Sequence, residues 1–282
     1  MAVAMAKMLA VALVAATGLH PHPGASGKVS KPHQAAAVPK KAATAPPAPA
    51  QSQNWSGYVI PSSSAPVTEA SGRWTVPTLD CAASPNSGAS AWVGIGGAVR
   101  PSGGTYGSLL QIGIRTDCIN GVQANLGWFE QFPSVPNVEQ DFAGLVVAAG
   151  DSMLASVSQA PGGAWQTRLD DLTTGMSGWM AAGTGWGVAA DSSGDVFAQP
   201  GSPTTLSYSG GYSAEWIVED YSVSTGPVPL ARFGTMVFTD LTTSLSRWSL
   251  TAKQAVELVQ GTKVISQPSA PAGNGFSVTR VG

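Results

Sequence analysis

From residue 51 onward the chain is a succession of short runs in which apolar and polar residues alternate. Such runs are "SGRWTVP" (71–77), "SLLQIGIR" (108–115), "GWFEQFP" (127–133) and "AEWIVEDYSV" (214–223), with Gly, Ser, Asn and Pro between them. Alternation of this kind is typical of β-strands, and many short strands separated by turn signals indicate a sandwich or a barrel. We therefore predict an all-β fold.

Two segments test this interpretation. "VVAAGDSMLASV" (146–157) predicts a strand, a tight turn and a second strand. "SLTAKQAVELVQ" (249–260) could form a short helix, but a strand with a turn fits it equally well.

The first 50 residues differ from the rest. Lys7 precedes an apolar run over residues 8–19, which has the length of a signal-peptide core and is too short to span a bilayer. The Ala-, Pro- and Lys-rich stretch that follows has no aromatic residue and cannot bury enough apolar surface to fold alone. We expect a signal peptide over residues 1–25, then a tether or a removable pro-segment over 26–50, and one folded domain over 51–282. The product should be secreted, without a membrane segment once the signal is removed.

The distribution of charged residues indicates which kinds of partner the folded part can bind. Five of the 14 Lys and Arg residues precede residue 51, whereas all 16 Asp and Glu residues follow it. The folded part thus carries nine basic and 16 acidic residues, a formal charge of −7. Nucleic-acid binding needs a basic surface, so we exclude it.

The residues that are missing exclude several chemistries. All three His lie in the first 50 residues, which removes Ser-His-Asp and Cys-His catalysis and the usual zinc hydrolase sites from the folded part. No Gly-rich phosphate loop is present. The two Cys, Cys81 and Cys118, are an even pair in a chain that we expect to be secreted, and they predict a disulfide. We expect no cofactor and no metal ion, so an enzyme of this composition must use carboxylates, assisted by amides.

Strand alternation sorts the candidate side chains. In "SLLQIGIR", Leu110, Ile112 and Ile114 share the face that should enter the core, which turns Gln111 outward toward a groove. In "SAEWIVEDY" (213–221), Glu215 and Glu219 share one face, roughly 13 Å apart at the usual strand rise, too far to act as one pair.

The chain resembles the glutamic peptidases (eqolisins), a family of secreted acid endopeptidases. The resemblance runs in order through "NWSGYV", "GRWTVP", "AWVGIGG", "LLQIGI", "GWFEQFP", "AGDSM", "AEWIVEDY" and "FTDL", over residues 54–282, with a Lys-containing pro-segment before them. It implies a lectin- or glucanase-like β-sandwich of two antiparallel sheets. It also implies that residues 26–50 are a pro-segment and 51–282 the catalytic domain.

The resemblance implies specific roles as well. Gln111 and Glu219 match the catalytic glutamine and glutamate of the family, whereas Glu215 is not catalytic. Trp92, Trp128, Glu130 and Phe132 would shape the substrate cleft. One departure is Gly96, where the family often carries an acidic residue, and this concerns the charge near the site and the pH optimum.

The expected reaction is hydrolysis of peptide bonds in a protein or peptide substrate by a monomer. Glu219 would take a proton from the attacking water and later protonate the leaving amine, while the Gln111 amide stabilises the oxyanion. Because glutamate titrates near 4.3 in water, an acid optimum would need little tuning. Two alternatives stay open: a glycoside hydrolase that uses Glu130 and Glu219, and a non-catalytic carbohydrate-binding sandwich. Asn54 also forms the formal glycosylation sequon "NWS".

Overall fold

The computed structural model describes residues 48–98, 108–133, 139–181, 185–190, 195–198, 208–223 and 226–282. The expected signal peptide and all but the last three residues of the expected pro-segment lie outside these ranges. Within them the only helical element is the 3₁₀ turn η1 (Ala252–Gln254). No helix in this part of the chain is long and apolar enough to cross a membrane.

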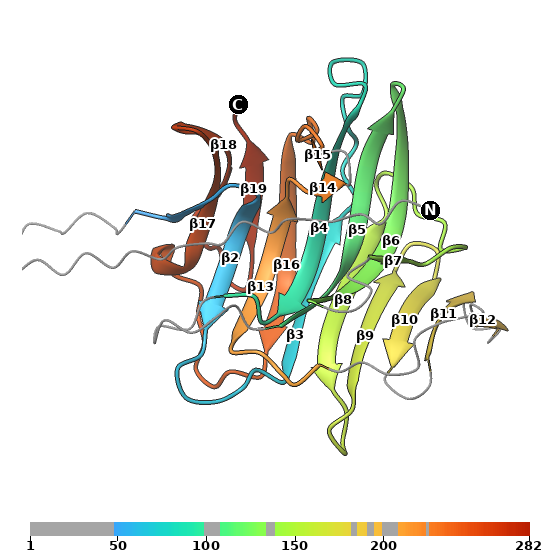
Figure 1. Ribbon diagram of the computed structural model, residues 1–282, viewed down its shortest axis with the longest axis vertical. Helices are drawn as coiled ribbons and strands as arrows, with labels where there is room; N and C mark the ends of the chain where they lie inside the picture. Colours follow the sequence, from blue (N-terminus) through green and yellow to red (C-terminus); the bar gives the residue numbers. More distant parts are fainter. Residues whose placement is uncertain are drawn as a thin grey trace, which may run out of the picture.

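The strands form two layers that face each other, as Figure 1 shows. The first layer has the order β7, β6, β5, β4, β13, β2, β17, with β1 added in parallel beside β17. Its bounds are β1 (Ala50–Ser52), β2 (Trp55–Pro61), β4 (Ser87–Ile95), β5 (Leu109–Ile119), β6 (Val122–Phe132), β7 (Gln140–Asp141), β13 (Ser213–Glu219) and β17 (Ala255–Gln260).

The second layer has the order β18, β19, β16, β3, β8, β9, β10, β11, β12, with antiparallel pairing throughout. Its bounds are β3 (Glu69–Thr75), β8 (Ser152–Gln159), β9 (Trp165–Asp171), β10 (Ser177–Ala181), β11 (Gly185–Ala190), β12 (Asp195–Ala198), β16 (Thr235–Thr243), β18 (Lys263–Pro268) and β19 (Phe276–Arg280). The hairpin of β17 and β18 joins the layers. A separate ribbon contains β14 (Ser222–Val223) and β15 (Gly226–Pro227). The expectation of an all-β sandwich is confirmed.

The main core lies between the layers, and alternation decides which side chains enter it. On β5 and β13, alternate residues belong to this core: Leu110, Ile112, Ile114, Ala214, Trp216 and Val218. A second apolar cluster lies on the opposite face of the first sheet: Trp55, Trp92, Leu109, Trp128, Ile217 and Val256. The first sheet therefore buries both of its faces, and the second cluster supports the candidate site.

The predicted disulfide is present. Cys81 and Cys118 are bonded and lie 37 residues apart in the chain. This bridge ties the end of β5 to the loop before β4, and closing a loop of that length is worth about 4 kcal/mol on the chain-entropy model.

The predicted hairpin over residues 146–157 is only half right. Residues 152–157 belong to β8, but residues 145–149 form no strand. The Asp151 carboxylate accepts the N–H of Ala148 at 2.6 Å, and the backbone of Gly150 and Asp151 bonds to Val76 instead of to a neighbouring strand of the same hairpin. Burial alternates along this segment, but its hydrogen bonds close a turn. In the other test segment, residues 255–260 form a strand.

Candidate active site

The residues that the sequence analysis selected lie on one face of the first sheet, the face that carries the second apolar cluster. Gln111 is in register with Gly94 and Glu130, and Glu219 is in register with Ser90. Gly94 and Ser90 lie on the same face of β4, four residues apart. The two proposed catalytic side chains thus belong to strands β5 and β13, with β4 between them.

Glu219 ends β13 and is held by two donors. The Trp92 indole N–H donates to Oε2 at 2.8 Å, and the Asn54 amide donates to Oε1 at 2.9 Å. The side chain is almost completely buried, with 7% of its residue surface exposed. Burial raises the pKa of Glu219 to about 7, and the charge of Glu130 contributes to the increase. The hydrogen bonds from Trp92 and Asn54 lower the pKa but do not cancel the effect of burial. The protonated form therefore predominates in acid.

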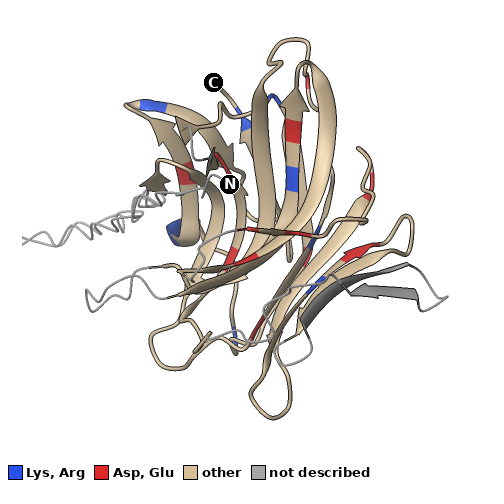
Figure 2. Cartoon of the chain, turned by 45° about the vertical axis from the view of Figure 1, so that its right-hand side comes forward, with Lys and Arg blue, Asp and Glu red and all other residues tan. Residues whose placement is uncertain are grey.

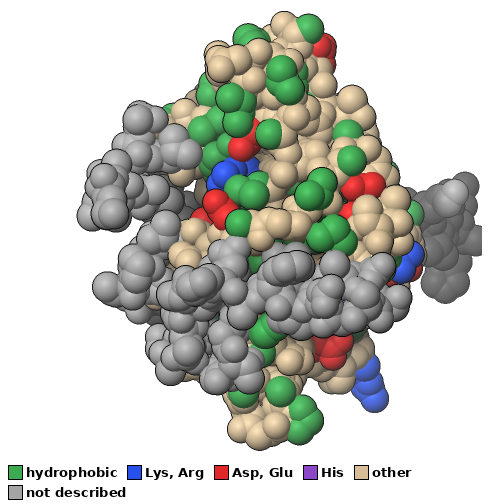
Figure 3. Space-filling view, turned by 90° about the vertical axis from the view of Figure 1, so that its right-hand side faces the viewer, with side chains coloured by type: hydrophobic (Ala, Val, Ile, Leu, Met, Phe, Trp, Pro, Cys, Tyr) green, Lys and Arg blue, Asp and Glu red, His purple; other side chains and the backbone are tan. Residues whose placement is uncertain are grey.

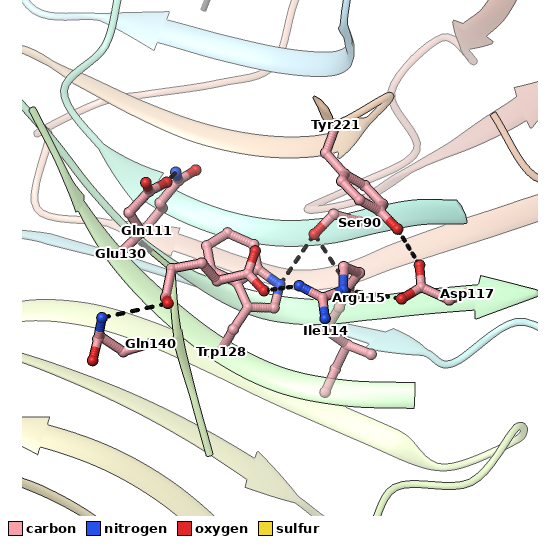
Figure 4. A network of polar contacts seen from close by, with 10 residues as sticks. Ser90, Gln111, Ile114, Arg115, Asp117, Trp128, Glu130, Gln140 and Tyr221 are labelled. Carbon is pink, nitrogen blue, oxygen red and sulfur yellow. Dashed lines mark hydrogen bonds and ion pairs between the residues drawn. The ribbon is translucent and has the colours of Figure 1, made fainter. Parts of the chain in front are cut away.

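Gln111 is held by Glu130. Its Nε2 donates to Glu130 Oε2 at 2.7 Å, as Figure 4 shows, while its Oε1 is buried without a hydrogen bond. Burial raises the pKa of Glu130, and the hydrogen bond from Gln111 lowers it. Glu130 contacts Gln111 and its charge also acts on Glu219, but the register places Glu219 four residues along β4 from the row of Gln111 and Glu130. Gln111 faces away from the core, as alternation predicts, but it is 1% exposed and not open to solvent.

Two tryptophans lie between the rows of Gln111 and Glu219. Trp128 is in register with Gly113, which is in register with Trp92. Both indoles are buried, and Trp128 Nε1 donates to Ser90 Oγ at 3.1 Å. Gly113 leaves room for Trp92, because a Cβ atom at residue 113 would lie 2.6 Å from the Cβ atom of Trp92 and 2.2 Å from the carbonyl oxygen of Ala91. Phe132 packs at the edge of the same apolar cluster.

Glu215 shares the face of Glu219, as predicted, but it is fully buried. Burial raises its pKa well above the ordinary value, so the carboxyl is neutral at any pH at which the enzyme could work in acid. It lies in the row of Gln111, on the far side of Gly94.

Gly96 has a backbone reason to be glycine. Its φ is +94°, and a Cβ atom there would lie 2.1 Å from the carbonyl oxygen of Ser108. An acidic side chain at this position would need both a strained backbone and a displaced neighbour. In this chain, then, the carboxyls near Gln111 come from β6 and β13 and not from residue 96.

A polar network that the sequence analysis did not identify lies beside the site (Figure 4). Arg115, in the row of Ser90 and Glu219, donates through Nε to Asp117 Oδ2 at 3.0 Å and through a terminal nitrogen to Glu139. Burial raises the pKa of Glu139 to about 8, and Arg115 lowers it. In Figure 3, which views the molecule from the right-hand side of Figure 1, basic groups likewise lie against acidic groups among apolar side chains.

Tyr221 closes this network from the other side. Its hydroxyl donates to Asp117, and its ring lies 5.8 Å from the guanidinium carbon of Arg115. The tyrosine crosses β4 at Gly88, where any side chain would collide with the hydroxyl. The network therefore extends across the sheet from Tyr221, which follows β13, to Glu139, which precedes β7.

Asn54 is the second feature that sequence reasoning missed. Alone it suggested only a glycosylation sequon, yet its amide nitrogen binds Glu219. Asn54 begins "NWSGYV", one of the motifs that carry the resemblance to the glutamic peptidases, and this position could have indicated a role in the site.

Comparison with known proteins covers most of the folded part of the chain. The model of the peptidase A4 family matches residues 53–280. The chain belongs to the peptidase A4 family. It is 26% identical over 250 residues to aspergillopepsin-2 from Aspergillus niger. This alignment covers 82% of this chain and 78% of aspergillopepsin-2. The resemblance to glutamic peptidases is thereby confirmed, and with it the class of enzyme, a glutamic endopeptidase.

Solved structures agree on the fold. Scytalido-glutamic peptidase, in a complex with a transition state analog inhibitor, superposes with a TM-score of 0.58 at 24% identity. SCP-B, a member of the eqolisin family in a complex with the tripeptide Ala-Ile-His, superposes with a TM-score of 0.56 at 22% identity. Each comparison covers 81% of this chain and 98% of the other.

Proposed function

We propose that this peptidase cleaves internal peptide bonds of proteins in acid, with Glu219 as the proton-transfer group and Gln111 as the oxyanion donor. The observation that carries the proposal is that both side chains lie on one face of one sheet and each is fixed by its own partner. Their register partners on β4, Gly94 and Ser90, lie four residues apart, so the substrate has to bridge the two rows. Trp92 and Asn54 fix Glu219, and Glu130 fixes Gln111. A fixed donor and a fixed acid are what hydrolysis of an amide requires.

The raised pKa of Glu219 adds one detail to the reaction. Below pH 7 the resting group is the neutral acid. One of its oxygens can accept a proton from the attacking water while the other gives its proton to the scissile carbonyl, whose oxygen binds the Gln111 amide. In the second step the carboxyl protonates the leaving nitrogen and takes a proton from a hydroxyl of the tetrahedral intermediate. Glu219 thus ends in the form in which it began.

Glu130 and the two indoles complete the site in this proposal. Glu130 accepts one hydrogen of the Gln111 amide, which leaves the other free to bind the substrate. Trp92, Trp128 and Phe132 belong to one apolar cluster and supply apolar walls for the peptide. The family membership and the Gln111–Glu130 pair favour this reading over sugar hydrolysis, in which Glu130 would be an acid or a nucleophile.

We further propose that the enzyme is secreted as a precursor. The apolar run at residues 8–19 and the basic segment after it support this, as does the disulfide, because such bridges persist in oxidising compartments. Sequencing the N-terminus of the mature protein from culture medium tests it, and an N-terminus at residue 1 contradicts it.

The catalytic assignment is tested by incubating purified protein with denatured protein at acid pH, with and without pepstatin. We expect cleavage that pepstatin does not block, and its loss in Glu219→Gln with the fold retained. Gln111→Ala should lower kcat far more than it raises KM, because the contact strengthens in the transition state. Substantial activity in Glu219→Gln would remove Glu219 from the mechanism.

A further inference from the structure

A hollow of about 490 Å³ lies at one end of the sandwich, apart from the active site. It is bordered by the loop after β3, the loop before β16 and the end of β19. Its lining residues are Thr78, Leu79, Asp80, Arg232, Phe233, Gly234 and Arg280. Two of the nine basic residues that follow residue 50 thus border one hollow, although charged residues are otherwise sparse on the strands (Figure 2).

Neither arginine forms an ion pair in the part of the chain that the structure describes, although the charge of Asp220 acts on Arg280 from a longer distance. The ion pairs there are Arg73–Asp240, Arg115–Asp117, Arg115–Glu139 and Arg168–Asp170. Arg232 is exposed, whereas Arg280 is half-buried. Burial lowers the pKa of Arg280, the charge of Arg232 lowers it further, and the charge of Asp220 raises it. The two guanidinium groups therefore repel each other.

Backbone hydrogen bonds fix the main chain at the two arginines. Asp80 N donates to Arg232 O at 3.0 Å, and Arg280 N donates to Gly234 O at 3.0 Å. Arg280 Nε also donates to the Leu230 carbonyl at 3.3 Å, which leaves the terminal nitrogens of its guanidinium for another acceptor. The Arg280 guanidinium is therefore partly fixed before any ligand arrives, which reduces the entropy lost on binding.

The acidic residue on the lining does not neutralise the pair. Asp80 Oδ1 accepts the N–H of Ala83 at 3.1 Å, so this carboxylate caps the turn that follows it. With two arginines and one aspartate, the hollow keeps a formal charge of +1 in a domain whose formal charge is −7.

We propose that this hollow binds an oxyanion, held between Arg232 and Arg280. Guanidinium groups bind carboxylate, sulfate and phosphate through paired N–H groups, and an anion between two arginines relieves their repulsion. The volume admits an organic acid as well as an inorganic ion. The shared chemistry is an oxyanion, and the source is either inorganic sulfate or phosphate, or the carboxylates of an organic acid.

The site is independent of the catalytic cleft. Arg280 acts on Asp220, whose pKa burial raises to about 6 and Arg280 lowers. Asp220 alternates with Glu219 and so faces away from the cleft. Binding can therefore be measured on Glu219→Gln protein, which by the proposed function does not digest itself. A failure of the oxyanion site then leaves the catalytic assignment untouched, and the reverse also holds.

The test is thermal unfolding of the full chain, as Glu219→Gln protein at pH 7, in sodium sulfate, potassium phosphate or sodium citrate. Sodium chloride at equal ionic strength is the reference. Because sulfate and phosphate stabilise most proteins by exclusion from the surface, the comparison is between variants and not only between salts. The variants are Arg232→Gln, Arg280→Gln and, as a matched control, Arg247→Gln, which removes an exposed arginine elsewhere.

We expect sulfate, phosphate or citrate to raise the melting temperature of the parent and of Arg247→Gln by several degrees more than that of Arg232→Gln. Titration calorimetry should show binding about tenfold weaker in Arg232→Gln. A response to sulfate or phosphate identifies an inorganic ion as sufficient, whereas a response to citrate alone identifies an organic acid. Equal responses of the parent, Arg232→Gln and Arg247→Gln to all three salts would overturn the proposal. Arg232 is exposed, so the outcome does not depend on whether Arg280→Gln folds.

Discussion

The buried carboxyl of Glu219 predicts how the stability of the fold depends on pH. Its pKa is about 7 in the folded chain and near 4.3 when unfolded, so the folded state binds more protons between these values. The unfolding free energy therefore falls as pH rises through this window, and the contribution of Glu219 is fully present below about pH 4. At 1.36 kcal/mol for each tenfold change in proton affinity, the total loss by pH 8 is about 4 kcal/mol, of which about 3 kcal/mol falls between pH 4 and 8.

The assay compares two variants that the proposed mechanism makes inactive, so that self-digestion does not interfere. Gln111→Ala is the reference, and Gln111→Ala with Glu219→Gln is the test. Urea denaturation at pH 4, 6 and 8 gives the unfolding free energy of each. We expect the reference to lose about 3 kcal/mol more than the double variant between pH 4 and 8.

Other carboxyls titrate in the same direction but do not confuse the comparison. Burial raises the pKa of Asp220 to about 6 and that of Glu139 to about 8, and both residues are present in the two variants. Glu69→Gln, which changes an exposed glutamate in the Gln111→Ala background, controls for the substitution itself. If the reference and the double variant lose stability in parallel, Glu219 does not have the raised pKa on which the proposed mechanism relies.

Four further outcomes are expected. Since the reaction needs the protonated form of Glu219, kcat/KM for a peptide substrate should fall as pH rises through about 7. If kcat/KM instead falls as pH is lowered below 7, the carboxylate is the resting form. Glu130→Ala should lower kcat at least tenfold with KM little changed, whereas Glu130→Gln keeps an acceptor for the Gln111 amide and should retain more activity. Equal losses in the two variants would exclude a role of Glu130 in positioning Gln111. Asn54→Ala removes a donor that lowers the pKa of Glu219, so the fall of kcat/KM with rising pH should move to higher pH. Mass spectrometry of the active enzyme should also find no glycan at Asn54, because its amide nitrogen already donates to Glu219. Replacing Cys81 and Cys118 by Ser should lower the unfolding free energy by about 4 kcal/mol in urea, and an unchanged value would mean that the bridge is not formed in solution.

Alternation predicts the layers well because it depends only on neighbouring residues in one strand. The faces of Leu110 and Gln111, and of Trp216 and Glu219, follow from side chains pointing alternately to opposite sides. The same rule fails at residues 145–149, where burial alternates but the Asp151 carboxylate takes the N–H of Ala148 and closes a turn. A periodic pattern predicts which side chains are buried, but it does not predict whether the backbone is hydrogen-bonded to a neighbouring strand.

The chemistry of the site depends on contacts between residues far apart in the sequence, and these are beyond a reading of single motifs. The donors to Glu219 come from Asn54 and Trp92, 165 and 127 residues away. Without them, a glutamate at the end of a strand predicts the pKa of a glutamate in water, and an acid optimum would need little tuning. In the folded chain, burial raises the pKa of Glu219 to about 7, so acid favours its protonated form. The residue that the resemblance implied is unchanged, but the protonation state in which it starts the reaction is a property of the assembled sheet.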